Sequence, residues 1–438
     1  SKPAAIHWGV PIDMTPAITP TTQAIANLWC LTGNLDVPGG NVISRHAFDV
    51  VAYALPGGKA IIKLDDAEAA SRRIGAERYG PLEAFIWRAQ PDLVLEQIFT
   101  EDPYPIKGMW IQACGILPGI GLDPRRWLEA LEKLDFIVAV DLFKTPTTQI
   151  ADVVLPAATF LEKDSVRSWW VPLQTVNKVL QVGECKPDIE INFELAKRFD
   201  PDFRWKTVHD LFDEILSPSG MTFRELQEKG WVFPPEGSSS APYQRYEKGL
   251  LRRDGKPGFN TPSGKMEIYS TLRENWGLEP IAHYEEPPFT PVTQPDKLEK
   301  YPLILSTGRR SAVYFHSEHR NIPWLRALDP NPVVEIHPNT AQERDIGDGE
   351  WVWIENWLGR CKYKAKVTRV VPRWMVMAAH GWWFPEEEGA KPHLFGTWKS
   401  NVNQLFPMGY QGKDGLGTPL KHMLCQVYKV GGGEVDDD

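Results

Sequence analysis

The clearest hydrophobic pattern of the chain lies between residues 108 and 141. Residues 108–113 and 136–140 are two short apolar runs, and the second, Phe-Ile-Val-Ala-Val, contains no polar residue. Strands of a parallel sheet that is covered on both faces have this pattern. Between the runs, Asp123 and Pro124 are typical of a helix start. Apolar residues then follow at helical spacing, namely Trp127, Leu128, Leu131 and Leu134. The pattern predicts a βαβ unit.

The loop after the first of these strands is rich in glycine. Residues 114–122 contain Gly115, Gly119 and Gly121, and the second strand ends at Asp141. Backbone N–H groups in such a loop can hold phosphates, and an acid at the end of the second strand can bind a ribose or a base. The spacing is not G-x-G-x-x-G, which disfavours an NAD site. A nucleotide site and a plain crossover whose glycines only turn the chain both remain open.

Shorter patterns flank the βαβ unit. Residues 4–8 are apolar and are predicted to be a short interior strand. Residues 21–31 have helical spacing, and Gly33 is placed to end that helix. Residues 152–155 are predicted to be a third strand, which Pro156 stops.

The C-terminal third has short strand-like patterns. Residues 361–368 alternate between Cys, Tyr, Ala and Val on one side and Lys or Thr on the other, as in a strand with one buried face. Six strands are predicted in all, at residues 302–306, 333–336, 351–356, 361–369, 374–379 and 422–430. Six short strands with long connections favour a small closed barrel.

These patterns predict three domains and a tail. Residues 1–206 are expected to be an α/β domain. Residues 207–298 are expected to be a mixed region of helix and linker, with a helix at 207–216. Residues 299–430 are expected to be the β-barrel domain, and residues 431–438 a disordered acidic tail without a functional role.

Composition narrows the class of protein. A hydrophobic content of 42% with 24% charged residues is typical of a folded globular chain,. The net charge of −9 argues against a nucleic-acid partner, because phosphate binding needs a clustered basic face,. No apolar run approaches the length of a membrane span. The first residues show neither the basic nor the apolar region of an export signal.

The cysteines argue against a metal site within this sequence. There are five, widely scattered and without a C-x-x-C pair, namely Cys30, Cys114, Cys185, Cys361 and Cys425. An iron–sulfur cluster and a structural zinc site both need closely spaced ligands. We therefore predict no metal ligand and expect all five to be buried free thiols.

Several polar residues follow predicted strands in the second half of the chain. Gly308 lets a ligand approach the backbone, and Arg309 can bind a phosphate or a ring carbonyl. His316, Ser317 and Arg320 lie a short loop away. Two asparagines near the C-terminus complete this set, Asn401 and Asn403. Taken singly, the residues of the first two segments are better explained as hydrogen-bonded loop residues, and the two asparagines have no unique interpretation.

Residues 380–384, His-Gly-Trp-Trp-Phe, follow another predicted strand. Strand-end loops are where sites are usually built. An apolar wall beside one titratable group suits a small apolar or aromatic substrate. Trp382 and Trp383 are the candidates for that wall, and His380 is the one catalytic candidate because it can carry a proton near neutral pH. Both Trp residues could equally pack against a neighbouring domain.

Taken together and in order, the motifs resemble those of the molybdopterin oxidoreductases of the dimethyl-sulfoxide-reductase family. The segments that carry the likeness are 31–40 (LTGNLDVPGG), 141–155 (DLFKTPTTQIADVVL), 258–267 (GFNTPSGKME), 303–321 and 401–403. Pro146 departs from the family, which usually has Glu there, so a polar role at that position is in doubt.

The resemblance implies an oxidoreductase that binds two molybdopterin guanine dinucleotides around one molybdenum or tungsten. It implies a Rossmann-like α/β domain that holds one guanosine end. It also implies a C-terminal double-psi β-barrel, of the aspartate-decarboxylase-like type, that closes over both pterins. By position, Gly115 and Asp141 would face a guanosine. The residues that would face the pterin and phosphate groups are Gly308, Arg309, His316, Ser317, Asn401 and Asn403, and the wall at 382–383 would lie near the substrate or pterin.

The resemblance also leads us to expect only the C-terminal, cofactor-binding part of a prokaryotic enzyme. The metal ligand and any [4Fe–4S] cluster are expected from an N-terminal region or another subunit, and an iron–sulfur electron-transfer subunit is the expected partner. The chain alone is expected to be inactive. Two alternatives remain, a non-catalytic scaffold within an electron-transfer complex and a nucleotide-binding module unrelated to molybdenum. The substrate and the compartment, cytoplasm or periplasm, stay open.

Overall fold

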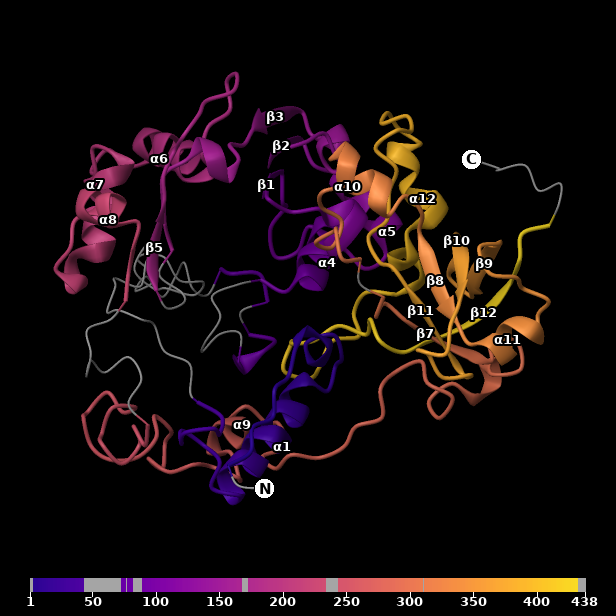
Figure 1. The fold of residues 1–438 in the computed structure, drawn as a ribbon, viewed down its shortest axis with the longest axis horizontal. Coiled ribbons are helices and arrows are strands. Elements are labelled where there is room, and N and C mark those ends of the chain that lie inside the picture. Colours follow the sequence, from indigo (N-terminus) through magenta and orange to yellow (C-terminus); the bar gives the residue numbers. More distant parts are fainter. Residues whose placement is uncertain are drawn as a thin grey trace. The chain divides into compact units, whose positions relative to one another are not determined.

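The computed structural model describes residues 3–42, 72–75, 77–81, 89–167, 172–233, 243–309 and 311–431 (Figure 1). The acidic tail predicted at 431–438 lies almost wholly outside these residues. The chain divides into two compact units. The first consists of residues 1–7, 23–89 and 155–282, and the second of residues 8–22, 90–154 and 283–438.

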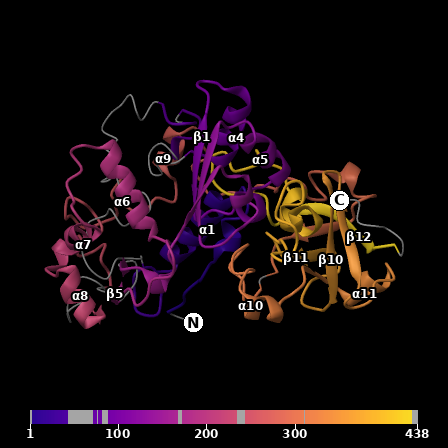
Figure 2. The same ribbon diagram turned by 90° about the horizontal axis from the view of Figure 1, so that it is seen from above.

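The second unit contains the predicted βαβ arrangement. Strands β1 (Gly108–Gln112) and β2 (Phe136–Asp141) pair in parallel, with Gly108 opposite Phe136. Helix α5 (Pro124–Leu131) connects them, and β3 (Val153–Pro156) extends the sheet in the order β1-β2-β3. Helices α4 (Pro91–Thr100) and α5 pack together beside this sheet (Figure 2). The predicted strands and the helix between them are confirmed.

Helix α5 begins where the sequence predicted. The Asp123 side chain accepts a hydrogen bond from the backbone N–H of Arg126 at 3.4 Å, and Pro124 occupies the first turn. The helix buries Trp127 and Leu131 against the sheet. Its start is thus fixed by the cap, and its rotation by the apolar face.

Residues 114–122 differ from the predicted loop. Residues Ile116–Ile120 form a short π-helical turn, in which Gly119 N–H donates to Gly115 O at 2.9 Å and Gly121 N–H to Ile116 O at 3.0 Å. A Cβ added to Gly121 would lie 2.6 Å from Ile116 O. The turn can therefore close only because glycine stands at its end.

The strand predicted at residues 4–8 is absent. Ala4 N–H donates to Asn34 Oδ1 at 3.0 Å, and Ile6 N–H donates to Asn41 Oδ1 at 2.8 Å. Asn41 Nδ2 donates in return to Ile6 O at 2.8 Å. The prediction was wrong because asparagine side chains, which both donate and accept, bind the backbone groups that a neighbouring strand would otherwise pair with.

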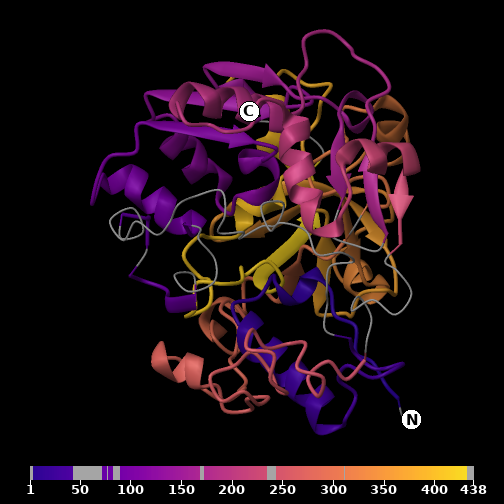
Figure 3. The same cartoon turned by 90° about the vertical axis from the view of Figure 1, so that its left-hand side faces the viewer.

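The predicted N-terminal helix is present as α1 (Ile18–Leu31), drawn in indigo in Figure 3, and it begins three residues earlier than expected. Gly33 follows it with φ of +68° and donates to Cys30 O at 3.1 Å. A positive φ here is the usual way in which glycine ends a helix.

The six predicted strands of the C-terminal region close into a barrel with the order β10-β8-β11-β7-β12-β9 (Figures 1 and 2). They are β7 (Leu303–Ser306), β8 (Val333–Ile336), β9 (Trp351–Asn356), β10 (Gly359–Val367), β11 (Met375–Ala378) and β12 (Met423–Lys429). The pairs β8–β10 and β7–β11 are parallel, and the other pairs are antiparallel. All six predicted strands are confirmed.

The alternation along β10 sets the inside of the barrel. Cys361, Tyr363 and Ala365 are buried in the barrel core, while Lys362 and Lys366 lie on its outer surface.

The burial of the five free cysteines matches the prediction only in part. Cys361 and Cys425 are buried, and burial raises the pKa of both, whereas the other three cysteines are half-buried.

The remaining helices of the second unit are α10 (Pro323–Leu328), α11 (Pro338–Gln342) and α12 (Thr397–Ser400). The first unit has an antiparallel sheet of β4 (Ser165–Arg167), β5 (Leu173–Val176) and β6 (Trp231–Val232). Its helices are α6 (Asp188–Phe199), α7 (Val208–Leu216), α8 (Phe223–Lys229) and α9 (Thr271–Asn275). Helices α7 and α8 share a core with β5 and each begins with a capping box,. The helix predicted at 207–216 is confirmed. None of the helices in the described ranges is long and apolar enough to cross a bilayer.

A buried ion pair joins two distant segments of the first unit. Arg245 donates to Asp36 Oδ1 at 2.9 Å through its side chain and to Asp36 Oδ2 at 2.8 Å through its backbone N–H. The two residues are 209 positions apart in sequence, and both are almost inaccessible to solvent. The loop that follows α1 is therefore fixed by a residue of a remote segment.

Removing one partner of this pair should be strongly destabilising, because it leaves the other charge buried and uncompensated. We expect Asp36→Ala to lower the free energy of unfolding by about 3–5 kcal/mol, measured by urea denaturation of the full chain. The matched control is Asp254→Ala, which removes a pair with Arg252 in which the carboxylate is exposed and the Arg252 side chain is partly exposed, and it should cost no more than about 1 kcal/mol. Equal effects of the two substitutions would contradict the structural role of the buried pair.

Candidate functional site

The glycine turn after β1 packs directly against a loop of the barrel region within the second unit. A Cβ added to Gly119 would lie 2.5 Å from Ser317 Oγ, and one added to Gly115 would lie 2.9 Å from the same atom. A Cβ on Gly381 would lie 2.9 Å from Pro118 O and 3.3 Å from Ser317 Cβ. The three segments meet with no room for side chains at these glycines.

Two buried asparagines hold the glycine turn in place. Asn401 Nδ2 donates to the carbonyls of Leu117 and Pro118, both at 3.2 Å. Asn403 Nδ2 donates to the carbonyls of Gly119 at 3.0 Å and Gly121 at 3.3 Å, and its Oδ1 accepts from Gly381 N–H at 3.2 Å. A turn that is not part of a regular sheet thus has its carbonyl groups satisfied by side chains. Asn401 and Asn403 are therefore positioning residues for the turn, and their direct contact with a ligand stays a prediction.

Two histidines meet beside the glycine turn. His316 Nδ1 and His380 Nε2 lie 2.8 Å apart, so one ring donates and the other accepts,. His316 has a φ of +53°, and His380 is only 8% exposed. The sequence singled out these residues separately, one as a cofactor contact and one as a proton carrier. The structure brings them into one hydrogen bond.

A buried cation lies next to this pair. Arg320 is 2% exposed, and its terminal NH1 donates to His316 O at 2.9 Å. Its guanidinium carbon lies 4.7 Å from the ring centre of Tyr314 and 4.5 Å from that of Trp382. Burial lowers the pKa of Arg320 to about 10, so it stays charged at neutral pH. Among the residues that the structure describes, it has no carboxylate partner and its Nε has no hydrogen-bond partner.

The sequence places Arg320 beside His316 and Ser317 in the run His-Ser-Glu-His-Arg, but Arg320 was not among the predicted cofactor contacts. The only indication in the sequence was its position shortly after His316 and Ser317. No neighbouring residue in the chain predicts that the Arg320 side chain is enclosed by aromatic rings. A buried guanidinium without a carboxylate is costly unless an anion or several polar groups compensate it.

Trp382 and Trp383 are fully buried. Trp382 belongs to the barrel core and packs edge-on against Tyr314. Trp383 Nε1 donates to Ser317 O at 2.9 Å, and its ring lies edge-on to Phe395. These contacts agree with the alternative that both Trp side chains serve in packing. Their role as a wall of the substrate site stays a prediction.

Gly308 and Arg309 lie at the carboxyl end of β7. A Cβ on Gly308 would lie 2.3 Å from Met377 Cε, and Arg309 forms a 3.4 Å ion pair with Asp329. Beside them Lys421 Nζ donates to Thr307 Oγ1 at 3.3 Å. Arg309, Arg320 and Lys421 thus bring three cationic side chains to this region, and all three are at least partly buried.

Asp141 lies at the carboxyl end of β2, as predicted. Its Oδ1 accepts from the backbone N–H groups of Leu142 at 2.7 Å and Phe143 at 3.4 Å. Burial and then the charge of Asp141 raise the pKa of the Cys114 thiol, which places the carboxylate near the glycine turn. Burial raises the pKa of Glu318, and Asp141 adds to this while His319 opposes it. One Asp141 oxygen therefore shapes its own turn, and the guanine contact stays a prediction.

The described part of the chain contains no group of three or more His, Cys, Asp or Glu side chains that could hold a metal ion. The contacts described above divide the predicted cofactor residues into two groups. One surrounds the glycine turn, with Ser317, His316, Asn401 and Asn403, and the other lies after β7, with Gly308 and Arg309. Tyr314 links them, because its hydroxyl donates to Asp329 O at 2.8 Å and its ring contacts Arg320.

Removing the Asn403 amide should loosen the glycine turn, because two carbonyls and one N–H lose their buried partner. We expect Asn403→Ala to lower the free energy of unfolding by at least about 1–3 kcal/mol, measured by thermal and urea denaturation. The control is Asn321→Ala, which removes one solvent-exposed bond to Lys144 O and should change stability by no more than about 0.5 kcal/mol. A neutral Asn403→Ala would refute the positioning role.

Comparison with known proteins identifies the family. The model of the family described as "Molybdopterin oxidoreductase" matches residues 1–198, and that described as "Molydopterin dinucleotide binding domain" matches residues 303–416. Dopamine dehydroxylase from Eggerthella lenta is 31% identical over 93% of this chain and 46% of its own length. Acetylene hydratase from Syntrophotalea acetylenica is 31% identical over 89% of this chain and 55% of its own length.

The fold agrees with a solved relative. Acetylene hydratase from Pelobacter acetylenicus superposes with a TM-score of 0.83 and 27% identity, over 98% of this chain and 61% of that one. The chain spans about half the length of the curated relatives that it matches. Because both family models match in the order of the motifs, with the second covering most of the barrel, this chain belongs to the molybdopterin oxidoreductases of the dimethyl-sulfoxide-reductase family.

Proposed function

We propose that this chain forms the dinucleotide-binding part of a molybdopterin oxidoreductase that carries a bis-molybdopterin guanine dinucleotide. The observation that supports this most is the close packing of the glycine turn 115–121 against the loop at Ser317, held by Asn401 and Asn403. It joins the two segments that the two family models match. Domain boundaries at 206 and 298, a Rossmann-like first domain and a double-psi barrel are part of the same proposal.

The residues present fit an anionic dinucleotide. Arg309, Arg320 and Lys421 place positive charge around the carboxyl end of β7, and the Arg320 Nε is buried without a partner among the described residues. These cations would bind the phosphate groups, since guanidinium and ammonium donors form their strongest hydrogen bonds with oxyanions. When bound, the group supplies redox or Lewis-acid chemistry at its metal.

Gly115 and Asp141 would contact the guanosine end. Gly115 stands at the start of the turn that follows β1, the position where a βαβ unit meets a nucleotide, and the carboxylate of Asp141 at the end of β2 would accept from a guanine N–H. Gly308, His316 and Ser317 would line the pterin side. These assignments rest on the family pattern and on the placement of the residues at strand ends.

The histidine pair is the proposed proton carrier. A hydrogen bond between His316 Nδ1 and His380 Nε2 holds one proton between two rings, and an imidazole can both donate and accept a proton through its two nitrogens. We propose that the pair gives a proton to the substrate and that Trp382 and Trp383 support it from behind. The names of the relatives refer to dopamine and acetylene, so a small organic substrate is proposed here.

The metal ligand, any [4Fe–4S] cluster and an iron–sulfur partner subunit are proposed to come from outside this sequence, and the choice between molybdenum and tungsten stays a prediction. Family membership argues against the alternative of a nucleotide module unrelated to molybdenum. A non-catalytic scaffold remains the competing proposal. Metal analysis of the complete protein separates the two, since a scaffold would hold no stoichiometric molybdenum or tungsten.

The dinucleotide assignment is tested on the complete protein by measuring guanine nucleotide released on denaturation. Asp141→Ala should weaken cofactor binding by roughly 1.5–3 kcal/mol, because a hydrogen bond to a charged group is lost. Asp135→Ala is the control, since Asp135 lies just before the other end of β2 in an exposed pair with Lys107. If Asp141→Ala released as much guanine nucleotide as the wild type, the guanine contact of Asp141 would be refuted. If the wild-type protein released no guanine nucleotide, the proposed function itself would be refuted.

The proton role is tested by kinetics on the cofactor-loaded enzyme. His380→Ala should lower kcat by about 10²–10⁴-fold, the usual contribution of a positioned acid or base, and should change its pH profile. Trp383→Ala should mainly lower thermal stability, through the lost bond to Ser317 O. If His380→Ala, like Trp383→Ala, changes only thermal stability and leaves turnover and substrate affinity intact, the histidine pair has only a packing role.

A further inference from the structure

The hydroxyl of Tyr363 joins two loop segments from inside the barrel. Tyr363 lies in the middle of β10, its side chain is fully buried, and its ring belongs to the barrel core. The hydroxyl donates to Ala379 O at 2.6 Å and accepts from Val402 N–H at 3.1 Å. Neither partner belongs to a strand, because Ala379 follows the end of β11 and Val402 begins the short helical turn Val402–Leu405. The hydroxyl therefore connects two segments that lie beyond the barrel strands.

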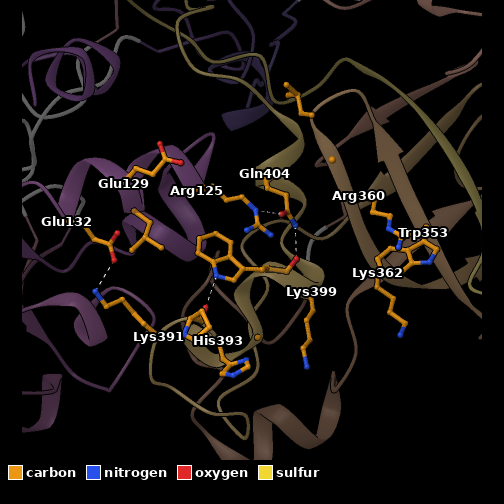
Figure 4. Close-up of a pocket in the computed structure, with 16 residues that line it drawn as sticks. Arg125, Glu129, Glu132, Trp353, Arg360, Lys362, Lys391, His393, Lys399 and Gln404 are labelled. Atoms are coloured by element: carbon orange, nitrogen blue, oxygen red, sulfur yellow. Dashed lines mark hydrogen bonds and ion pairs between the residues drawn. The ribbon is translucent and has the colours of Figure 1, made fainter. Parts of the chain in front are cut away.

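Apolar packing alone does not require this hydroxyl. Lys362, the preceding residue on β10, faces the other way and lines a cavity on the outer side of the barrel, together with Arg125 and Gln404 (Figure 4). On the inner side, a phenylalanine ring would fill the same space as Tyr363. A buried hydroxyl is costly unless it is hydrogen-bonded, so the two bonds of Tyr363 are what offsets its burial.

The two bonds use both capacities of a hydroxyl group, one as a donor and one as an acceptor. Burial raises the pKa of Tyr363 well above its ordinary value, so the hydroxyl keeps its proton and donates to Ala379 O at any working pH. Val402 is the first residue of its turn, where a backbone N–H has no partner within the helix. The Tyr363 oxygen supplies that partner.

The backbone at His380 is held on both sides by these contacts. Ala379 immediately precedes His380, and Gly381 immediately follows it. Tyr363 binds the carbonyl of Ala379, while Gly381 N–H donates to Asn403 Oδ1 at 3.2 Å. The position from which the imidazole extends is therefore fixed by one side-chain bond before it and one after it.

The same tyrosine contacts the segment that holds the glycine turn. Val402 stands between Asn401 and Asn403, whose side-chain amides donate to carbonyls of the turn. Asn403 takes part in both arrangements, because its Nδ2 binds the turn and its Oδ1 binds Gly381 N–H. The glycine turn and the backbone at residue 380 thus share one continuous set of hydrogen bonds.

We infer that Tyr363 is a positioning residue for the histidine pair, and that its hydroxyl links the place of His380 to the state of the glycine turn. His316 Nδ1 and His380 Nε2 are 2.8 Å apart, and a hydrogen bond weakens steeply when its angle is distorted. A shift of Ala379 moves the adjacent His380 directly. Binding of the dinucleotide at the turn would act on the pair through the segment of Val402. This role rests on the proposed function, in which the pair gives a proton to the substrate.

The test follows the proton between the two rings by nuclear magnetic resonance of the full chain with isotope-labelled histidine. The shared N–H is recognised as the imidazole resonance that His316→Gln and His380→Gln both remove. Tyr363→Phe keeps the ring and removes only the hydroxyl. In this variant we expect the shared proton to exchange with water at least about tenfold faster, because local opening of the pair is no longer opposed by the bond to Ala379 O.

Thr340→Val is the matched control for the loss of a buried hydroxyl. Thr340 is 1% exposed, and its Oγ1 donates to a backbone carbonyl, that of Arg373, at 2.6 Å. The control should lower the midpoint of thermal unfolding much as Tyr363→Phe does, but it should leave the histidine resonance unchanged. If Tyr363→Phe fails to fold, Asn403→Ala removes the bond on the other side of His380 and should accelerate the same exchange.

On the complete, cofactor-loaded enzyme, Tyr363→Phe should lower kcat by about ten- to hundredfold, the cost of misplacing a catalytic group by about 1 Å. Neither KM nor the released guanine nucleotide should change. The inference would be overturned by an unchanged kcat, by unchanged exchange in Tyr363→Phe, by equal acceleration in Thr340→Val, or by the absence of the shared resonance from the wild type. A wild type that released no guanine nucleotide would refute the proposed function instead, and the exchange rate in Tyr363→Phe would still decide whether Tyr363 positions the pair.

Discussion

The close approach of the turn at residues 115–121 to the loop at Ser317 is the constraint on which the second unit depends. Two glycines leave space there that any Cβ would fill. Such contact brings backbone carbonyls into a dry region, where each unsatisfied group would cost about 1–3 kcal/mol. Asn401 and Asn403 supply the missing donors. The turn after β1 and the barrel region are therefore held by backbone-to-amide bonds as much as by apolar packing.

This arrangement also explains why the chemistry-bearing residues gather where they do. Once the turn is fixed, Gly381 must pass close to it, and the residue before Gly381, His380, then meets His316. Arg320 is enclosed behind them by Tyr314 and Trp382. A pair of imidazoles and a buried guanidinium thus share one region with the glycine turn. The combination suits binding of an anionic cofactor with proton exchange nearby.

The sequence predicted elements whose signal is local. Continuous apolar runs gave β1 and β2, and alternation gave β10 with Cys361 and Tyr363 inside the barrel. Prediction from the sequence failed where the structure of a segment depends on residues that are far away in the chain. Residues 4–8 look like a strand, yet Asn34 and Asn41 bind their backbone. The burial of Arg320, and the cavity in which Arg125 faces Trp398, arise from segments far apart in sequence, so no local pattern could report them.

The most direct test of the central claim is hydrogen–deuterium exchange on the complete protein with and without its molybdopterin cofactor. If the turn at 115–121 and the loop at 307–317 bind the dinucleotide, their amide groups should exchange markedly more slowly when the cofactor is bound. Strand β10 of the barrel should exchange at the same rate in both states. Unchanged exchange in both loops, with protection only elsewhere in the protein, would contradict the role assigned to this chain.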